Sequence, residues 1–343
     1  MSGLTSKLIL GPRIGQGHFG EVLLGKDPVH GDVAVKVLRV QPGESPSEWH
    51  ARKAELLKEG QRLSRADHRN VVRVYHLVEA EADDEIYLVM RLCRNGSYQS
   101  AFEAGPLQLK TVLKAATDVA LGLQALHARQ MLHRDIKPGN LLNDNGVTML
   151  GDFGLVTDEI VLGYASQAGY LDHLAPEIFA GKGTSVRSDI WALGMTIYRL
   201  LHGAEWYSRL LPITPSIIAA GGFAASLPWL PHVSESWRRV IRSMMHDDPS
   251  RRLQSASQVL AALSRLSSDP NWACRVTKNQ VRWESRGKKR RVTVTWDIHS
   301  PRKHEWSAVS EPIGAGIRRT LAKSNGPTDS RKARAALKKF FSA

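Results

Sequence analysis

Short apolar runs bounded by turn residues dominate the first hundred positions and predict β-strands. After the third run, Ser45-Pro46-Ser47-Glu48 has the composition of a helix start, with a capping serine, proline at the first helical position and glutamate three residues after the cap. The sequence therefore predicts a β-rich N-terminal region that contains one helix. The expected strands cover residues 8–14, 22–25, 33–38, 71–77 and 86–92.

Over residues 107–268 the apolar positions recur mainly at helical spacing. The last helix of this region is expected over residues 255–266, with a serine as its cap. Asp269-Pro270-Asn271 then interrupts the pattern, and we expect a domain boundary there. Residues 1–270 are thus expected to form one domain and residues 271–343 a separate small module.

The pattern changes to alternation in the C-terminal module. Val281, Trp283 and the apolar residues of 292–298 alternate with polar ones, and residues 285–288 between them suit a turn, so we predict a β-hairpin. From Asp329 onward, apolar residues share one helical face and basic residues the other, which predicts a helix that closes a small sheet. Further strands of this sheet are expected around residues 272–276 and 306–308.

Length and composition narrow the class of protein. A chain of 343 residues fits two domains of unequal length. Its two cysteines, Cys93 and Cys274, support no disulfide framework and favour a reducing compartment. No apolar stretch reaches the length of a membrane span, and the first residues resemble neither a signal peptide nor a myristoylation site. We expect a soluble cytoplasmic protein.

The net charge of +14 is concentrated at one end of the chain. Residues 271–343 hold 18 Lys and Arg against five Asp and Glu, a net charge of +13, so the first 270 residues are nearly neutral. A clustered positive field favours polyanionic partners. Nucleic acid, a docked acidic protein substrate and an anionic membrane surface are all compatible with it, as is a basic surface that is merely solvated.

A glycine-rich stretch between the first two expected strands is the first candidate for chemistry. Residues 15–22 place glycines at positions 15, 17 and 20. Glycines let a hairpin tip bring its amides close to phosphate oxygens. A strand rather than a helix follows, which disfavours a dinucleotide-binding fold. Taken alone, the stretch is equally compatible with an ordinary tight hairpin.

Lys36 follows the apolar run Val33-Ala34-Val35, where an unpaired ammonium group would be costly to bury. It therefore needs an anionic partner. Glu59 on the following helix is the preferred candidate, and Glu55 on the same helix is the alternative, although Glu55 is also compatible with a solvated surface position.

Two later segments concentrate polar groups in apolar surroundings. Residues 132–142 contain Asp135, Lys137 and Asn140, a spacing that chance loops seldom provide because buried polar groups need partners. Asp152 follows in Asp152-Phe153-Gly154 and offers a second carboxylate for a divalent cation.

Taken together and in this order, these motifs resemble those of Hanks-type, eukaryotic-like serine/threonine protein kinases. The resemblance extends to Ala175-Pro176-Glu177, to the segment 189–194 (Asp-Ile-Trp-Ala-Leu-Gly) and to Arg252, which falls where the family keeps an arginine paired with the glutamate of Ala-Pro-Glu. It implies an α+β bilobal protein kinase fold, with a β-rich N-lobe and an α-helical C-lobe, followed by the small α+β module.

The resemblance also implies roles for individual residues. Lys36 would hold the α- and β-phosphates of ATP, and Glu59 would orient Lys36. Asn140 and Asp152 would bind Mg²⁺, and Asp135 would accept the proton of the attacking hydroxyl. The expected catalytic residues are Asp135, Asn140, Asp152 and Lys137, the last neutralising the transferred phosphoryl group. The expected ATP-binding residues are Gly15, Gln16, Gly17, Gly20, Val22, Ala34, Lys36, Glu59, Met90, Cys93 and Leu142.

Two residues depart from the family pattern near the acceptor side. A lysine two residues after Asp135 is the pattern of serine/threonine kinases, so a Ser or Thr hydroxyl is the expected acceptor. Tyr170 stands where these kinases usually have a threonine that links the acceptor-binding loop to the catalytic Asp and Lys, and a phenol is too long to copy that contact. His173 replaces the usual aromatic residue before Leu174. Both departures affect acceptor preference.

Arg134, directly before Asp135, implies regulation in kinases of this type, because its guanidinium group can pair with a phosphate and order a loop. The alternative is that Arg134 only binds backbone carbonyl groups. The candidate phosphorylation sites are Thr157, Tyr164 and Ser166.

The predicted function is ATP- and Mg²⁺-dependent transfer of the γ-phosphate to protein Ser/Thr hydroxyls, with autophosphorylation, and with the basic module used for substrate docking or nucleic-acid binding. A pseudokinase scaffold is disfavoured because no essential residue is missing. A small-molecule kinase is disfavoured by the Ala-Pro-Glu segment, which such enzymes usually lack. A nucleic-acid-binding protein regulated by its kinase lobe is a further alternative.

Overall fold

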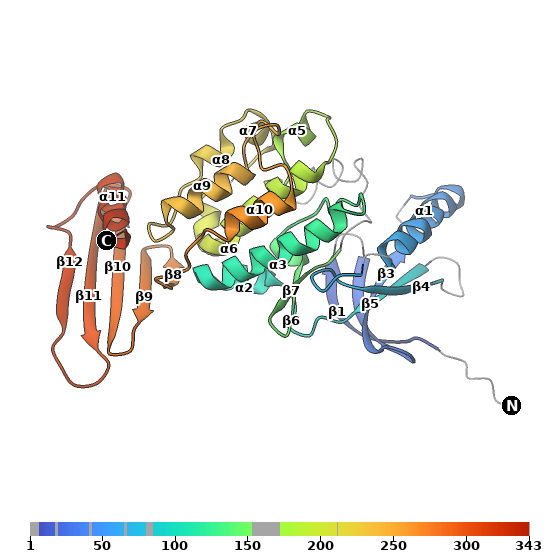
Figure 1. The fold of residues 1–343 in the computed structure, drawn as a ribbon, viewed down its shortest axis with the longest axis horizontal. Coiled ribbons are helices and arrows are strands. Elements are labelled where there is room, and N and C mark those ends of the chain that lie inside the picture. Colours follow the sequence, from blue (N-terminus) through green and yellow to red (C-terminus); the bar gives the residue numbers. More distant parts are fainter. Residues whose placement is uncertain are drawn as a thin grey trace.

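A five-stranded sheet, a helical region and a second five-stranded sheet follow one another along the molecule (Figure 1). The computed structural model describes residues 7–17, 20–40, 43–64, 67–79, 85–152, 172–210 and 212–342. In the part of the chain that these ranges cover, no helix is long and apolar enough to cross a membrane.

The N-terminal sheet is antiparallel, with the strand order β1-β2-β3-β5-β4. All five strands predicted from the sequence are present, but the fourth begins at Val74 rather than Val71. Val71 instead forms a parallel bridge with Leu150, and the Val72 amide donates to the Leu150 carbonyl, so this segment ties the sheet to the helical region. The strands are β1 (Ile9–Gly17), β2 (Gly20–Asp27), β3 (Gly31–Arg39), β4 (Val74–Glu79) and β5 (Glu85–Arg91).

The predicted helix of this region is α1 (Pro46–Ser64). Its start has the expected capping box: the Ser45 amide donates to Glu48 Oε2 (2.8 Å), and the Glu48 amide donates to Ser45 Oγ (3.4 Å). At the start of β2, Gly20 has a φ of 137°, and a Cβ there would lie 2.0 Å from the Val37 carbonyl oxygen, so only glycine fits.

The helical region is built around α6 (Val186–Tyr207), which is buried along most of its length. Ser185 caps it in a reciprocal capping box with Ser188. The last predicted helix is present as α10, with Ser255 as its cap, and ends at Leu263 rather than Leu266. The other elements are α2 (Tyr98–Ala104), α3 (Leu109–His127), β6 (Leu141–Asp144), β7 (Val147–Leu150), α5 (Pro176–Phe179), α7 (Pro215–Ala219), α8 (Phe223–Ser226), α9 (Glu235–Met244) and α10 (Ala256–Leu263).

The C-terminal sheet is an antiparallel meander in the order β12-β11-β10-β9-β8. The predicted hairpin is β9–β10, and Asp329 caps the predicted last helix by accepting from the Lys332 amide (2.8 Å). Strand β12 was not predicted, because Arg319–Lys323 contains too little apolar alternation. The elements are β8 (Ala273–Thr277), β9 (Gln280–Arg286), β10 (Arg290–Ser300), β11 (Lys303–Pro312), β12 (Arg319–Lys323) and α11 (Ser330–Phe341).

The C-terminal sheet and the helical region share one apolar core. The indole of Trp283 on β9 donates to His232 Nδ1 (2.9 Å), which lies just before α9. The guanidinium of Arg334 on α11 lies over two indoles, 5.5 Å from the ring centre of Trp206 on α6 and 5.7 Å from that of Trp296 on β10. The sequence predicted a domain boundary near residue 270 but left open whether the module contacts the helical region, and in the structure buried aromatic side chains join the two.

Candidate active site

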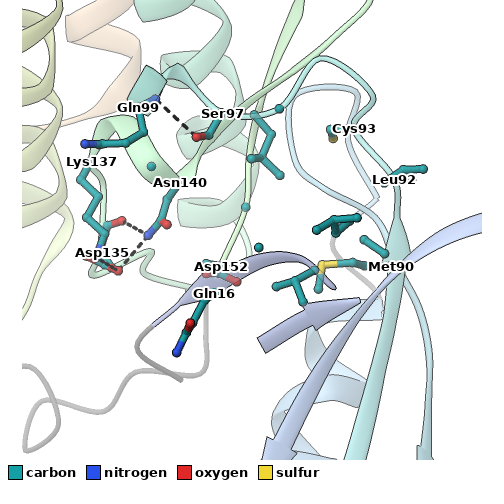
Figure 2. Close-up of a pocket in the computed structure, with 18 of the residues that line it drawn as sticks. Gln16, Met90, Leu92, Cys93, Ser97, Gln99, Asp135, Lys137, Asn140 and Asp152 are labelled. Atoms are coloured by element: carbon teal, nitrogen blue, oxygen red, sulfur yellow. Dashed lines mark hydrogen bonds and ion pairs between the residues drawn. The ribbon is translucent and has the colours of Figure 1, made fainter. Parts of the chain in front are cut away.

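A cavity of about 480 Å³ lies between the N-terminal sheet and the segment that carries Asp135 and Asn140 (Figure 2). One wall comes from β1, β2 and β3, the back from the end of β5 and the residues after it, and the floor from residues 135–142 and 151–152. Eleven residues proposed from the sequence line it: Gly15, Gln16, Val22, Ala34, Met90, Cys93, Asp135, Lys137, Asn140, Leu142 and Asp152.

The part of the cavity nearest β5 is apolar. Ala34 and Met90 pair across β3 and β5, and Leu142 closes the opposite side. Burial raises the pKa of the Cys93 thiol to about 11, so this cysteine is a neutral apolar surface rather than a reactive group at physiological pH. A flat aromatic base suits such a slot, with the backbone after β5 at its edge.

Lys36 is completely buried on β3, and its Nζ lies 2.9 Å from Asp152 Oδ1. Lys36 itself does not line the cavity, but Asp152 does, so the ion pair joins the sheet to the cavity floor. Glu59 lies on α1, and its side chain falls outside the described residues. Glu55, the alternative partner, is exposed.

Asp135 is the centre of a second polar group, which Figure 2 shows on the side of the cavity opposite Met90 and Cys93. Asn140 Nδ2 donates to the main-chain oxygen and to Oδ2 of Asp135, both at 2.8 Å. Lys137 Nζ lies 2.8 Å from the same Oδ2. One carboxylate oxygen of Asp135 is therefore held by two neighbours.

The other oxygen, Asp135 Oδ1, lies 3.3 Å from Nε2 of the buried His173. That contact lacks hydrogen-bond geometry, so within the described residues Oδ1 is a buried acceptor with no hydrogen-bond donor. Burial opposes ionisation of Asp135, but the contacts with His173 and Lys137 outweigh it and lower the pKa. Asp135 is thus an anion at neutral pH, and Oδ1 is its carboxylate oxygen that accepts no hydrogen bond from the described residues.

The loop that carries Asp135 has a strained backbone, and hydrogen bonds to Asp189 hold it in place. Arg134 has a φ of 69°, which is rare for a residue other than glycine. Asp189, buried at the start of α6, accepts from the main-chain amides of His133 (2.9 Å) and Arg134 (2.8 Å). Burial opposes its ionisation, and hydrogen bonds, led by that from His127, reverse this and lower the pKa of Asp189. An anchored backbone keeps Asp135 in place.

The donor atoms on the cavity floor suit a magnesium ion. Both amide protons of Asn140 point at Asp135, so the side-chain oxygen of Asn140, Oδ1, is the atom left for a ligand. Asp152 adds a partly exposed carboxylate. Mg²⁺ prefers oxygen ligands and is usually held by one or two side chains plus substrate phosphates, so these two residues fit it.

Asp172 and Arg199 were not predicted from the sequence, although Arg199 lines the cavity. Asp172 is completely buried and forms short contacts with the guanidinium of Arg199 and the hydroxyl of Tyr207. Its carbonyl also accepts from the indole of Trp191 (3.2 Å). Two charged residues among apolar neighbours were the only sequence signal. The network fixes the segment that brings His173 to Asp135.

The ion pair expected between Glu177 and Arg252 is confirmed. Arg252 Nη1 and Nη2 donate to the two carboxylate oxygens of Glu177 at 2.7 and 3.0 Å, with both residues buried. This bidentate contact ties α5 to the segment before α10.

The other predicted residues lie elsewhere or cannot be placed. Gly17 and Gly20 pair with each other at the end of the β1–β2 hairpin, and Gly20 is not among the described residues that line the cavity. Arg134 Nε donates to Thr184 Oγ1 (3.0 Å), so its described contact is with a hydroxyl group. Further residues line the cavity without having been predicted individually, among them Ile14, Gly96, Ser97 and Gln99. The proposed phosphorylation sites Thr157, Tyr164 and Ser166, and also Tyr170, lie outside the described residues.

The family model of the protein kinase domain matches residues 9–263, which include both walls and the floor of the cavity. The chain belongs to the protein kinase family. This confirms the bilobal kinase fold and the resemblance to Hanks-type serine/threonine kinases. The match ends before β8, so it does not extend to the C-terminal sheet of this kinase.

Curated relatives agree with this assignment. The chain is 31% identical to mitogen-activated protein kinase kinase kinase 3 of Arabidopsis thaliana over 73% of its own length and 39% of the relative's. It is also 31% identical to serine/threonine-protein kinase PrkC of Bacillus subtilis over 72% of this chain and 38% of that protein. Serine/threonine-protein kinase PknB of Mycobacterium leprae is 29% identical over 77% and 44%, respectively. The similarity thus spans less than half of each relative.

Proposed function

We propose that this kinase transfers the γ-phosphate of ATP to Ser or Thr hydroxyls of proteins with the help of Mg²⁺. The observation that carries the proposal is the convergence of two polar groups in one cavity. The Lys36–Asp152 ion pair joins the N-terminal sheet to the cavity floor, and Asp135 with Asn140 and Lys137 lies on the same floor. A phosphate chain between them would meet cations, oxygen ligands for a metal and an acceptor for the hydroxyl proton.

The adenine ring would occupy the apolar slot between Ala34 and Leu142, which directs the phosphates toward Lys36. The ammonium group of Lys36 would pair with phosphate oxygens as it now pairs with Asp152. Glu59 remains the proposed group that orients Lys36. Mg²⁺ held by Asn140 and Asp152 would supply further neutralisation of the phosphate charge.

Asp135 would orient the acceptor hydroxyl and take its proton. Its pKa is lowered, so it is a weak base, but phosphoryl transfer with a loose transition state demands little proton abstraction before the new bond forms. Positioning is the larger contribution. Lys137, beside Asp135, would neutralise the transferred group.

His173 is the proposed positioning residue for Asp135. The resemblance to the family leads one to expect a threonine hydroxyl near the catalytic Asp, where this chain has Tyr170 instead. His173 lies 3.3 Å from Asp135 Oδ1, on a segment fixed by Asp172 and Arg199. The ring can therefore restrict the position of the carboxylate by direct contact, where the family would use that hydroxyl.

The pseudokinase alternative is disfavoured by the same geometry, because a scaffold has no need for a buried lysine paired to a cavity-floor carboxylate. The small-molecule kinase alternative is disfavoured by the Glu177–Arg252 pair, in which the glutamate of Ala-Pro-Glu has a buried structural role. Autophosphorylation at Thr157, Tyr164 or Ser166 is part of the proposal.

The C-terminal module is proposed to recruit a partner. None of the described residues 271–342 lines the cavity, which favours docking over a role in the chemistry. Its charge is compatible with nucleic acid or with an acidic substrate protein. We also propose a cytoplasmic location, in keeping with two cysteines that form no disulfide.

The test is transfer of labelled γ-phosphate from ATP to a generic protein substrate, with and without Mg²⁺, followed by mass spectrometry of the modified residues. We expect phosphoserine and phosphothreonine from the wild type and a loss of about a hundredfold or more in Asp152→Asn. Asp297→Asn, in the C-terminal sheet, is the matched control and should transfer normally. Full transfer by folded Asp152→Asn would refute the proposed metal role.

A further inference from the structure

Two connections of the C-terminal sheet meet at one end of it. Residues 287–289 join β9 to β10, and residues 313–318 join β11 to β12; we call them together the tip surface (Figure 1, lower end of the sheet). The Ile313 amide donates to the Lys289 carbonyl (2.9 Å), so the two connections are in direct contact. Figure 1 shows the tip surface at the lower end of the sheet, with α11 toward the other end.

The tip surface has a fixed shape because one arginine holds it. Arg290 Nε donates to Ser310 Oγ (2.6 Å), and its Nη2 donates to the carbonyls of Ser310 (2.8 Å) and Ile317 (3.1 Å). These bonds tie the connection 313–318 to the start of β10, directly after the connection 287–289. The apolar residue Ile317 is thus held outward by the backbone and does not fold back onto the sheet.

Two aliphatic side chains project from this end. Ile317 is 79% exposed and Ile313 is 41% exposed, separated only by Gly314, Ala315 and Gly316. Exposed apolar groups that lie together can mark an interaction site, because burying their surface against a partner is favourable.

Cations surround these isoleucines. The segments 285–292 and 312–324 contain eight Lys and Arg and no Asp or Glu. Glu311, at the edge, is already shared between Arg291 (3.0 Å) and Arg318 (3.5 Å). In the described residues, no carboxylate forms an ion pair with Lys288, Lys289 or Arg319, so their charge is available to a partner.

We propose that the tip surface docks this kinase on an anionic lipid bilayer, with Ile313 and Ile317 inserted among the acyl chains and the neighbouring cations against the headgroups. The combination of exposed isoleucines and neighbouring cations favours a lipid bilayer over a nucleic acid. Exposed isoleucines gain nothing from a phosphodiester backbone, whereas hydrocarbon removes their surface from water. Basic residues that flank an inserted group strengthen binding to anionic headgroups.

Nucleic acid is the weaker occupant for a second reason. Binding of single strands relies on exposed aromatic side chains that stack on bases. The tryptophans of this sheet are buried, with Trp283 and Trp296 at 0% exposure and Trp306 at 8%, and neither segment of the tip surface contains an aromatic residue. The aromatic residues of the sheet therefore stabilise the fold and are unavailable for stacking.

The experiment is co-sedimentation of the full chain with vesicles of phosphatidylcholine alone or with phosphatidylserine as about a third of the lipid, at about 0.1 M salt. We expect retention only by the anionic vesicles. Lys288→Ala with Lys289→Ala should weaken it about 25-fold, at about fivefold per cation. Ile313→Ser with Ile317→Ser should weaken it by about tenfold or more.

Two matched controls should bind as the wild type does. Val29→Ser removes an aliphatic group that is 80% exposed in the β2–β3 turn, and Lys303→Ala with Lys339→Ala removes two exposed cations elsewhere on the module. Phosphate transfer and circular dichroism, measured on every variant, report on activity and folding independently of vesicle binding.

Failure to bind anionic vesicles would overturn the proposal, and so would wild-type binding by the double isoleucine variant. Retention on DNA or on polyglutamate that depends on Lys288 and Lys289 but not on the isoleucines, without vesicle binding, would also overturn it and assign the surface to nucleic acid or acidic protein. None of these results bears on phosphate transfer, which the proposal does not require.

Discussion

The two five-stranded antiparallel sheets of this kinase bury different kinds of side chain. The N-terminal sheet buries Lys36, a charged residue, at 0% exposure beside the cavity. The C-terminal sheet buries Trp283 and Trp296 at 0% exposure against α11 and the helical region. The architecture is similar, but the first sheet buries a group that costs free energy and the second buries groups that supply it.

This difference links the N-terminal sheet to catalysis and the C-terminal sheet to the stability of the fold. A buried ammonium group persists only where anions meet it, and in this protein one anion is on the cavity floor. A buried indole contributes through its area and packing and needs no ligand. We therefore expect changes in the N-terminal sheet to affect catalysis and changes in the C-terminal sheet to affect folding.

The largest expected effect is on stability, in the C-terminal sheet. Trp296→Ala should lower the free energy of unfolding by about 3–5 kcal/mol, because it leaves a cavity beside Trp206 and removes one of the two rings under Arg334. Urea unfolding gives this value. Phosphate transfer per folded molecule should be unchanged. A loss of transfer per folded molecule would show that the C-terminal sheet also affects catalysis.

Lys36→Met should give the opposite result. We expect kcat/KM for ATP to fall about 10²–10³-fold, since the cation that meets the phosphates is lost. The free energy of unfolding should change little, because an apolar side chain of similar length fills the buried position and Asp152, which loses its partner, is partly exposed to water. Steady-state kinetics and urea unfolding on the same preparation measure both. Strong destabilisation would show that Lys36 is structural.

Acid should weaken the C-terminal contact. Burial lowers the pKa of His232, which accepts from Trp283, from 6.5 to about 3. The folded protein therefore keeps it neutral while the unfolded chain takes up a proton below pH 6.5, so stability falls as the pH drops from there. The loss is about 1.4 kcal/mol per pH unit, roughly 2 kcal/mol by pH 5.

Unfolding in urea at pH 7 and pH 5 measures this loss. His232→Asn keeps an acceptor for the indole but cannot titrate. Between pH 7 and pH 5 its free energy of unfolding should therefore fall by roughly 2 kcal/mol less than that of the wild type. An equal pH dependence in the two proteins would rule out the role of His232.

His173→Leu should have the smallest effect, about tenfold on kcat, or roughly 1.4 kcal/mol. It removes the ring that contacts Asp135 but leaves the ATP site intact, so KM for ATP should not change. His173→Gln can place an amide N–H near Asp135 Oδ1 and should restore kcat to within about twofold. Equal loss in both variants would indicate a packing role instead of a positioning one.

The contacts on the cavity floor could be predicted because they depend on local spacing. Asp135, Lys137 and Asn140 lie within one loop, and their contacts with one another follow from that loop. Capping residues such as Ser45 and Asp329 are similarly local. Such local patterns can be recognised in the sequence without knowledge of the tertiary structure.

The contacts that could not be predicted join distant positions. Trp283 and His232 are 51 residues apart, and no periodicity links them, so the docking of the C-terminal sheet onto the helical region had no sequence signal. The approach of His173 to Asp135 likewise depends on Asp172 and Arg199, 27 residues apart. Strand β12 forms because β11 offers an edge, in spite of its own weak pattern.

The most direct test that phosphate transfer takes place in the cavity is single-turnover transfer by Asp135→Asn, with ATP binding measured in parallel. Asparagine keeps the shape of Asp135 but lacks the carboxylate charge that orients the acceptor hydroxyl and takes its proton, so we predict wild-type affinity for Mg²⁺-ATP and transfer to Ser and Thr slower by about a hundredfold or more. Transfer at the wild-type rate by this variant would contradict the account.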